Sequence, residues 1–129
     1  MLKKILLISI LLGLLGFVWS MTPARAQDPV KLWPNMFSVK LENERVRVFE
    51  WIFKPGDKET LHTHPEFVSY FLTGGKLRKF GPDGKVVAER EVKAGDTFWS
   101  KPEKHAFENI GTTEIHAIIV EFKTNPYKE

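Results

Sequence analysis

Short apolar segments separated by turn residues follow one another along the chain from about residue 36 to its end. Gly, Pro, Asn and Asp residues lie between them at intervals of about ten residues, a spacing typical of β-sandwiches and β-barrels. No segment after residue 26 keeps a helical i, i+3, i+4, i+7 stripe over several turns. The pattern therefore predicts an all-β domain. The segments rich in Val, Ile, Phe, Trp and Tyr are 45–53, 67–72, 76–80, 86–92, 97–99, 106–110 and 115–122.

Two of these regions predict more than a strand. In residues 45–53 both parities carry large apolar side chains, which fits a strand packed on both faces for part of its length. The run Gly81-Pro82-Asp83-Gly84 lies between two β-rich segments. These are turn-forming residue types, so the sequence predicts a hairpin there.

The first 26 residues differ from the rest of the chain. Lys3 and Lys4 precede an apolar run over residues 5–19, and Ala24-Arg25-Ala26 follows it. This is the layout of a secretory signal peptide, and the run is shorter than the about 20 apolar residues of a membrane span. A retained membrane anchor is the alternative. We expect cleavage before Gln27 and a periplasmic or secreted protein without stable membrane association.

The remaining chain divides into two parts. Residues 27–35 contain two prolines and no periodicity, so we expect an extended N-terminal arm. Residues 36–129 are expected to form a single β-barrel domain. Their length suits one domain and leaves no room for a second.

Composition excludes several classes of function. The chain has no cysteine, so any metal must be held by histidines and carboxylates. Loss of the signal peptide would remove Lys3, Lys4 and Arg25 from the 19 basic residues, leaving as many basic as the 16 acidic ones. A neutral domain gives no reason to expect binding to nucleic acid or to an anionic membrane.

His62 and His64 form the first candidate site. Residues at i and i+2 of a strand point to the same face, with about 6 to 7 Å between their Cα atoms. Both rings can therefore reach one metal ion. Taken alone the pair is weak evidence, because two histidines at this spacing also occur on exposed strands.

Two blocks of residues around these histidines resemble the paired motifs of the cupin superfamily. Those motifs are G-x5-H-x-H-x3,4-E-x6-G and G-x5-P-x-G-x2-H-x3-N. The chain departs from them twice: the motif glutamate would fall at Phe67 or Val68, and only a displaced Pro102 remains of P-x-G. The matching residues are Gly56, His62, His64 and Gly74 in the first motif and Gly95, His105 and Asn109 in the second.

The resemblance implies a fold and a metal site. The fold is a double-stranded β-helix, a cupin-type jelly-roll barrel, with His62, His64 and His105 converging inside one end. They would bind one divalent transition metal (Fe, Zn, Ni, Cu or Mn) as neutral imidazoles. Glu66 is a further candidate ligand, although a solvated loop carboxylate is the simpler interpretation.

Three other residues are candidates for the pocket beside the metal. Phe107 and Asn109 share the strand parity of His105 and can point inward. His116 shares parity with Ile118 and Val120 and can approach the site if that face is internal. The alternatives are an ordinary core aromatic for Phe107 and a hydrogen-bonded or edge-exposed strand histidine for His116.

Three classes of function remain open at this stage, and catalytic residues stay unknown. The first is a metal-dependent dioxygenase acting on a small chelating substrate, which the resemblance favours. The second is a non-catalytic module that binds a metal or small ligand, and the third is a metal-free barrel for protein association. The resemblance and the apolar, Trp-containing edges also favour a homodimer. Motifs for nucleotide, serine-hydrolase or zincin chemistry are absent from the sequence.

Overall fold

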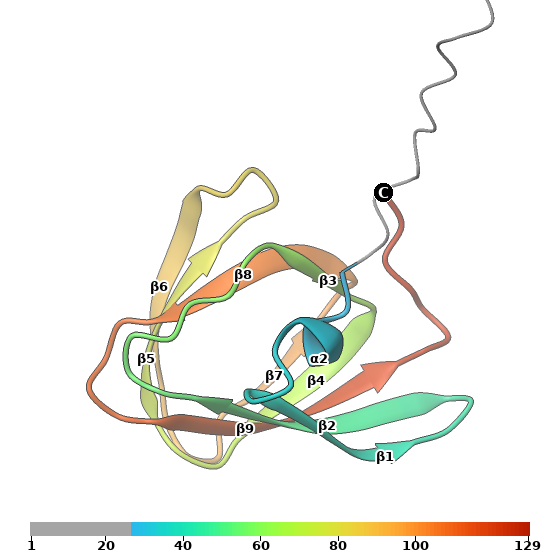
Figure 1. Cartoon of the computed structure of the whole chain (residues 1–129), viewed down its shortest axis with the longest axis horizontal. Helices are drawn as coiled ribbons and strands as arrows, with labels where there is room; N and C mark the ends of the chain where they lie inside the picture. The colour runs from blue at the N-terminus through green and yellow to red at the C-terminus, as the bar shows by residue number, and fades with distance from the viewer. Residues whose placement is uncertain (1–26) are drawn as a thin grey trace, which may run out of the picture.

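Two β-sheets face each other in the computed structural model, which describes residues 27–129 (Figure 1). Residues 1–26, which carry the expected signal peptide, lie outside the described residues. The strands are β1 (Phe37–Glu42), β2 (Val46–Phe53), β3 (His62–His64), β4 (Glu66–Phe71), β5 (Gly75–Phe80), β6 (Val86–Val92), β7 (Thr97–Ser100), β8 (Glu103–Asn109) and β9 (Ile115–Phe122).

The strand order is that of a jelly-roll barrel. One sheet has the order β1-β2-β9-β4-β7 and the other β3-β8-β5-β6, and every pairing is antiparallel. Strands far apart in sequence are therefore neighbours, such as β2 with β9 and β3 with β8. The all-β double-stranded β-helix expected from the sequence is confirmed.

The predicted hairpin is also confirmed, between β5 and β6. The Gly81 amide donates to the carbonyl oxygen of Lys85, and the Gly84 amide donates to that of Gly81. Gly84 has φ of 76°, a left-handed conformation that a residue without Cβ adopts at little cost.

Three glycines of the two sequence motifs lie where a residue with a Cβ would be strained or would clash. Gly56 and Gly95, with φ of 84° and 89°, lie in the turns that follow β2 and precede β7. Gly74 lies against the backbone of Val92, where a Cβ would be only 2.7 Å from the Val92 carbonyl oxygen. These motif positions are thus explained by backbone geometry.

The core lies between the sheets and is rich in aromatic residues. Phe49, Trp51 and Phe53 alternate along the inner face of β2, and Ile115, Ala117 and Ile119 do so along β9. Burying one Phe side chain contributes roughly 1.5–3 kcal/mol, so this layer is a main source of stability. The polar His cluster lies at one end of it.

Residues 27–35 are not the extended arm that the sequence analysis expected. Pro29–Leu32 form the short helix α2, with Asp28 as N-cap accepting from the Val30 amide at 3.1 Å. An Asp cap followed by Pro at the first helical position favours a helical turn, and this Asp-Pro pair was the missed signal. The correction matters because Trp33, directly after α2, packs edge-on against His62 with 5.3 Å between ring centroids.

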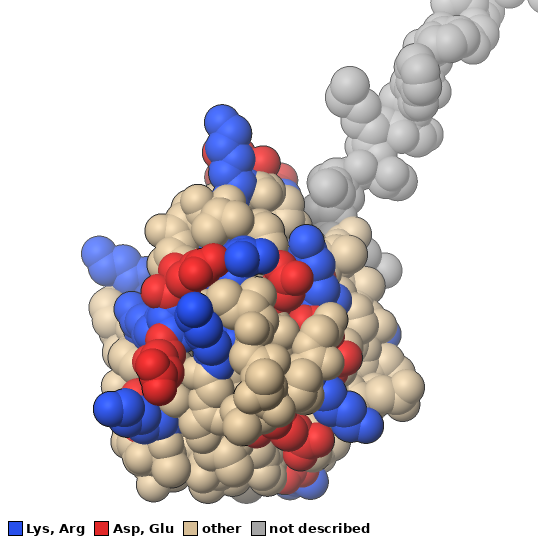
Figure 2. Space-filling view, turned by 90° about the vertical axis from the view of Figure 1, so that its left-hand side faces the viewer, with Lys and Arg blue, Asp and Glu red and all other residues tan. Residues whose placement is uncertain are grey.

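The surface carries charges of both signs. On the face shown in Figure 2, Lys and Arg side chains lie next to Asp and Glu side chains, with no wide area of one sign. Surface ion pairs include that of Arg78 with Glu89. Within residues 27–129 there is no helix with the length and apolar character needed to cross a bilayer.

Candidate metal centre

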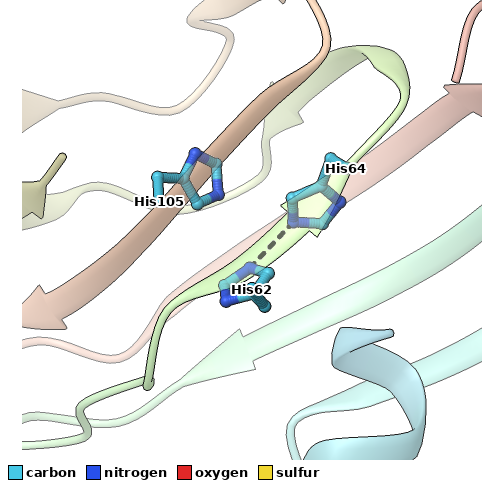
Figure 3. Close-up of side chains that lie close together, drawn as sticks. All are labelled: His62, His64 and His105. Carbon is cyan, nitrogen blue, oxygen red and sulfur yellow. Dashed lines mark hydrogen bonds between the residues drawn. The ribbon is translucent and has the colours of Figure 1, made fainter. Parts of the chain in front are cut away.

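The three histidines of the sequence motifs meet at one point between the sheets (Figure 3). His62 and His64 come from β3, and His105 lies directly opposite His62 on the neighbouring strand β8. Their ring centroids are 4.8 to 5.1 Å apart, and one nitrogen of each ring lies within 4.8 Å of the others. All three side chains are buried. The i, i+2 spacing on a strand therefore acts as the sequence analysis expected.

Each ring is held through its Nδ1 atom by a group that can only accept a hydrogen bond. The Nδ1–H of His62 donates to the Thr60 carbonyl oxygen at 2.9 Å. That of His64 donates to Glu121 Oε1 at 2.6 Å, and that of His105 to Glu103 Oε1 at 2.9 Å. With Nδ1 as the donor in each ring, Nε2 is the nitrogen left to bind a metal, and in a neutral ring it carries a lone pair.

The Nε2 lone pairs face one another. Nε2 of His62 and Nε2 of His64 are 2.9 Å apart, the contact dashed in Figure 3. In neutral rings two acceptors at this distance repel each other, unless a proton or a metal cation lies between them. A metal ion held by both nitrogens at about 2.0–2.1 Å from each would replace this repulsion by attraction. The donor set therefore fits a divalent transition metal, and its identity is not fixed by three imidazoles.

The carboxylates behind the histidines are each paired with a cation. Glu121 is buried and accepts from Arg47 at 2.7 Å, and Arg47 also reaches Asp28 at 2.9 Å. Glu103 accepts from Lys79 at 2.6 Å. Carboxylate–histidine pairs of this kind orient a ligating ring and raise its basicity. Since the carboxylate charges are balanced locally, a bound metal would keep most of its positive charge.

Burial keeps His62 and His105 neutral. It lowers the pKa of His62 to about 3, helped by the neighbouring rings of His64 and His105. Burial also lowers the pKa of His105 to about 4, although Glu103 opposes the shift. Neutral imidazole is the form that binds metal, so proton competition at these two rings begins only well below neutral pH.

Glu59 is a carboxyl group beside the cluster that the sequence analysis did not identify. It is 3% exposed, and its Oε2 lies 3.9 Å from Nε2 of His62. The Phe107 amide donates to the same oxygen at 2.9 Å. Burial raises the pKa of Glu59 to about 8, although the Phe107 amide and the Trp51 indole N–H act to lower it. The carboxyl therefore holds a proton at neutral pH.

Replacing Glu59 by glutamine should change how stability depends on pH. Because the folded-state pKa is raised from 4.5 to about 8, wild-type protein binds an extra proton in the folded state between these values. The free energy of unfolding of wild-type protein minus that of Glu59→Gln should therefore fall by about 2–4 kcal/mol as pH rises from 4.5 to 8.

Urea denaturation of both metal-free proteins from pH 5 to pH 9 measures this difference. His62 and His105 are present in both, so their contributions cancel. Parallel stability curves would show that Glu59 is not buried as an uncharged group.

Glu66, the further candidate ligand, lies away from the cluster. In β4 the inward position belongs to Phe67, whose ring centroid is 5.0 Å from that of His64. Glu66 points outward and accepts from Trp99 Nε1 at 2.7 Å and from Asn125 Nδ2 at 2.9 Å. The solvated-carboxylate interpretation is the one that agrees with the geometry. An apolar ring occupies the place where the motif has its glutamate.

The three pocket candidates have different outcomes. Phe107 lines the cavity beside the histidines and packs against the core. Asn109 is buried, but its amide donates to the carbonyl oxygens of Phe53 and Thr113, so it joins strands. His116 lies on the outer face of β9 and bonds to Glu50 Oε1 at 2.6 Å. The expectation that His116 approaches the site is wrong, and the hydrogen-bonded strand histidine is correct.

Several functional residues carried little sequence signal. Glu121 occupies the inner parity of β9 with Ala117 and Ile119, but the other parity is also apolar, so the strand's inner face cannot be read from the sequence. Glu103 lies two residues before His105, which on a strand places both on one face; this spacing could have identified it. Glu59 lies outside any strand and carried no periodic signal.

Solved structures support the fold and show the family. The chain is 30% identical to a cupin domain from Bordetella pertussis, with a TM-score of 0.61, covering 67% of this chain and 91% of that one. It is 28% identical to a protein with a double-stranded β-helix domain from Klebsiella pneumoniae, with a TM-score of 0.53, covering 65% of this chain and 72% of that one.

More distant structures share the fold alone. A cupin superfamily protein from Desulfitobacterium hafniense is 12% identical, with a TM-score of 0.52, over 67% of this chain and 74% of that one. No protein-family model matches the chain, and no curated protein does.

Proposed function

Because the chain belongs to the cupin superfamily, we propose that it is a metal-dependent dioxygenase that binds one divalent transition metal through Nε2 of His62, His64 and His105 and acts on a small chelating substrate. The proposal goes beyond the similar structures, whose descriptions name a fold and no reaction. It rests on the chemistry of this chain's own site.

One observation carries the metal site. All three Nδ1 atoms donate to oxygen acceptors, and this fixes three Nε2 lone pairs toward one point in a buried cluster. A histidine trio that served only to fill the core would not need the same tautomer in every ring. Three protein ligands leave coordination positions for exogenous molecules, and a redox-active metal supplies Lewis-acid and electron-transfer chemistry there.

The surrounding residues suit chemistry protected from water. Phe67 and Phe107 pack on the rings of His64 and His105, with centroids 5.0 and 4.8 Å apart, and keep the inner end apolar. Glu59, whose carboxyl holds a proton at neutral pH, is the group placed to donate one beside His62.

Oxygen uptake tests the proposal. We expect the iron-loaded protein to consume oxygen with at least one member of a panel of diketones, thiols and catechols, and His105→Ala to consume none. Bound metal without turnover on the whole panel would favour the non-catalytic binding module instead. Protein that binds no metal would favour the association module.

Export and dimerisation are further parts of the proposal. Lys3 and Lys4, the apolar run and the Ala24-Arg25-Ala26 site support cleavage before Gln27. Intact-mass analysis of the periplasmic or secreted protein measures whether residues 1–26 have been removed. A mass that includes residues 1–26 would contradict it. For the homodimer, β1 is an edge strand with Val39 and Leu41 exposed, and light scattering measures the assembly.

A further inference from the structure

The cavity beside the histidines has aromatic walls and polar residues at its two ends. It has a volume of about 280 Å³, near the lower limit of the about 300–1,000 Å³ typical of small-molecule sites. His64, His105 and Glu59 lie at its buried end. Its walls carry six aromatic rings from both sheets: Phe37, Trp51, Phe67, Phe71, Phe98 and Phe107.

The mouth of the cavity lies between two edge strands. β6 ends the four-stranded sheet, and its Ala88 and Arg90 line the cavity and are exposed. β7 ends the five-stranded sheet, and its Trp99 lines the cavity and is 56% exposed. A ligand can therefore enter between β6 and β7 and reach the histidines from the solvent side.

Arg90 is a cation at this mouth without an acidic partner. Its guanidinium Cζ lies 4.5 Å from the centroid of Phe98, which belongs to the opposite sheet. Among residues 27–129 no carboxylate lies within ion-pair distance of Arg90, whereas Lys79, the other cation of the cavity, is paired with Glu103. A guanidinium stacked on a ring keeps its in-plane N–H donors available, the geometry that binds a carboxylate.

The charges of the cavity favour an anion. With a divalent metal on three neutral imidazoles, the positive charges of the metal and Arg90 exceed the negative charge of Glu103, which Lys79 already balances. The aromatic walls favour an apolar body, because each Å² of apolar surface removed from water contributes about 25 cal/mol. An amphipathic anion satisfies both requirements.

We propose that the cavity binds a small amphipathic carboxylate, whose apolar body packs among the aromatic walls, whose carboxylate pairs with Arg90 at the mouth, and whose opposite end reaches the histidine trio. This inference rests on the proposed function, since it names the substrate class of the same site. The pairing with Arg90, however, does not need the metal, and this allows separate tests.

Calorimetric titration with matched probes tests the inference. The probes are benzoate, 3-phenylpropionate and cinnamate, each compared with its own amide, on zinc-loaded and on EDTA-treated protein. We expect at least one carboxylate to bind wild-type protein about twofold to fivefold more tightly than its amide, in both metal states. Arg90→Gln should remove this preference, because Arg90 is exposed and its replacement leaves the fold intact.

Arg78→Gln is the matched control. Arg78 lies on the neighbouring strand β5 and pairs with Glu89 and Glu108 outside the cavity, so the carboxylate preference should stay unchanged. Wild-type protein that binds no carboxylate more tightly than its amide would overturn the inference. So would a preference that survives in Arg90→Gln, since the carboxylate would then be held elsewhere.

Elemental analysis of the same samples separates this inference from the proposed function. Zinc at one per chain without a carboxylate preference would overturn the inference and leave the metal site intact. An Arg90-dependent preference in protein that binds no zinc would support the inference and contradict the proposed function.

Discussion

Replacing His105 by alanine is expected to reduce bound metal from one per chain to a small fraction. His105 is the one ligand that comes from β8, so its loss leaves only the two rings of β3. Changes behind a metal ligand already cost about 10–100-fold in affinity, so we expect loss of the ligand itself to cost more than about 100-fold. Elemental analysis of protein purified without chelators and loaded with zinc measures the effect, and His62→Ala should behave in the same way.

His116→Ala is the matched control for this experiment. His116 is also a strand histidine bonded to a glutamate, but it lies on the outer face of β9. The His116→Ala protein should retain one metal per chain. Stoichiometric metal in His105→Ala would show that the trio is not the metal site.

Replacing Glu121 by alanine should have the largest effect on stability. Glu121 is buried and joins the Arg47 guanidinium to the His64 ring. Its removal leaves Arg47, 14% exposed, without its buried partner and His64 Nδ1–H without an acceptor. Breaking a buried pair costs about 3–5 kcal/mol when a charge is left unpaired, and because Asp28 still pairs with Arg47 we expect about 3 kcal/mol. Urea denaturation of metal-free protein should therefore show a loss of this size.

Glu50→Ala is the control for Glu121→Ala. Glu50 bonds to His116 at 2.6 Å, the same distance as that between Glu121 and His64, but on the solvent side of the sheet. This half-buried pair should contribute less, because water reaches it. An equally small effect of Glu121→Ala would show that the buried network does not stabilise the fold.

The strands could be predicted because their signals are local. β2, β6 and β9 agree within one residue with the apolar segments 45–53, 86–92 and 115–122, since turn residues mark both ends of each. The hairpin before β6 follows from Gly81-Pro82-Asp83-Gly84. Strand β1 was not singled out, although Phe37, Val39 and Leu41 alternate with polar residues over its six positions, a strand pattern that the search for apolar runs missed.

The histidine trio could be predicted because the motif residues that flank the histidines form the turns and hydrogen bonds that position them. Gly56 and Gly95 make left-handed turns, and Asn109 joins Phe53 to Thr113, so the spacing of the histidines follows from backbone requirements. The groups around the trio could not be predicted in the same way. Glu59 and Arg90 reach the cavity through the packing of two sheets, which no local pattern records.

The central claim is that one metal ion lies on the three Nε2 atoms, and an anomalous difference map from a crystal of the zinc-loaded protein at the zinc edge tests it most directly. The tautomers fixed by Thr60, Glu103 and Glu121 predict a single peak about 2.0–2.1 Å from Nε2 of His62, His64 and His105. A zinc ion bound through Nδ1, or bound elsewhere on the chain with the trio empty, would contradict the claim.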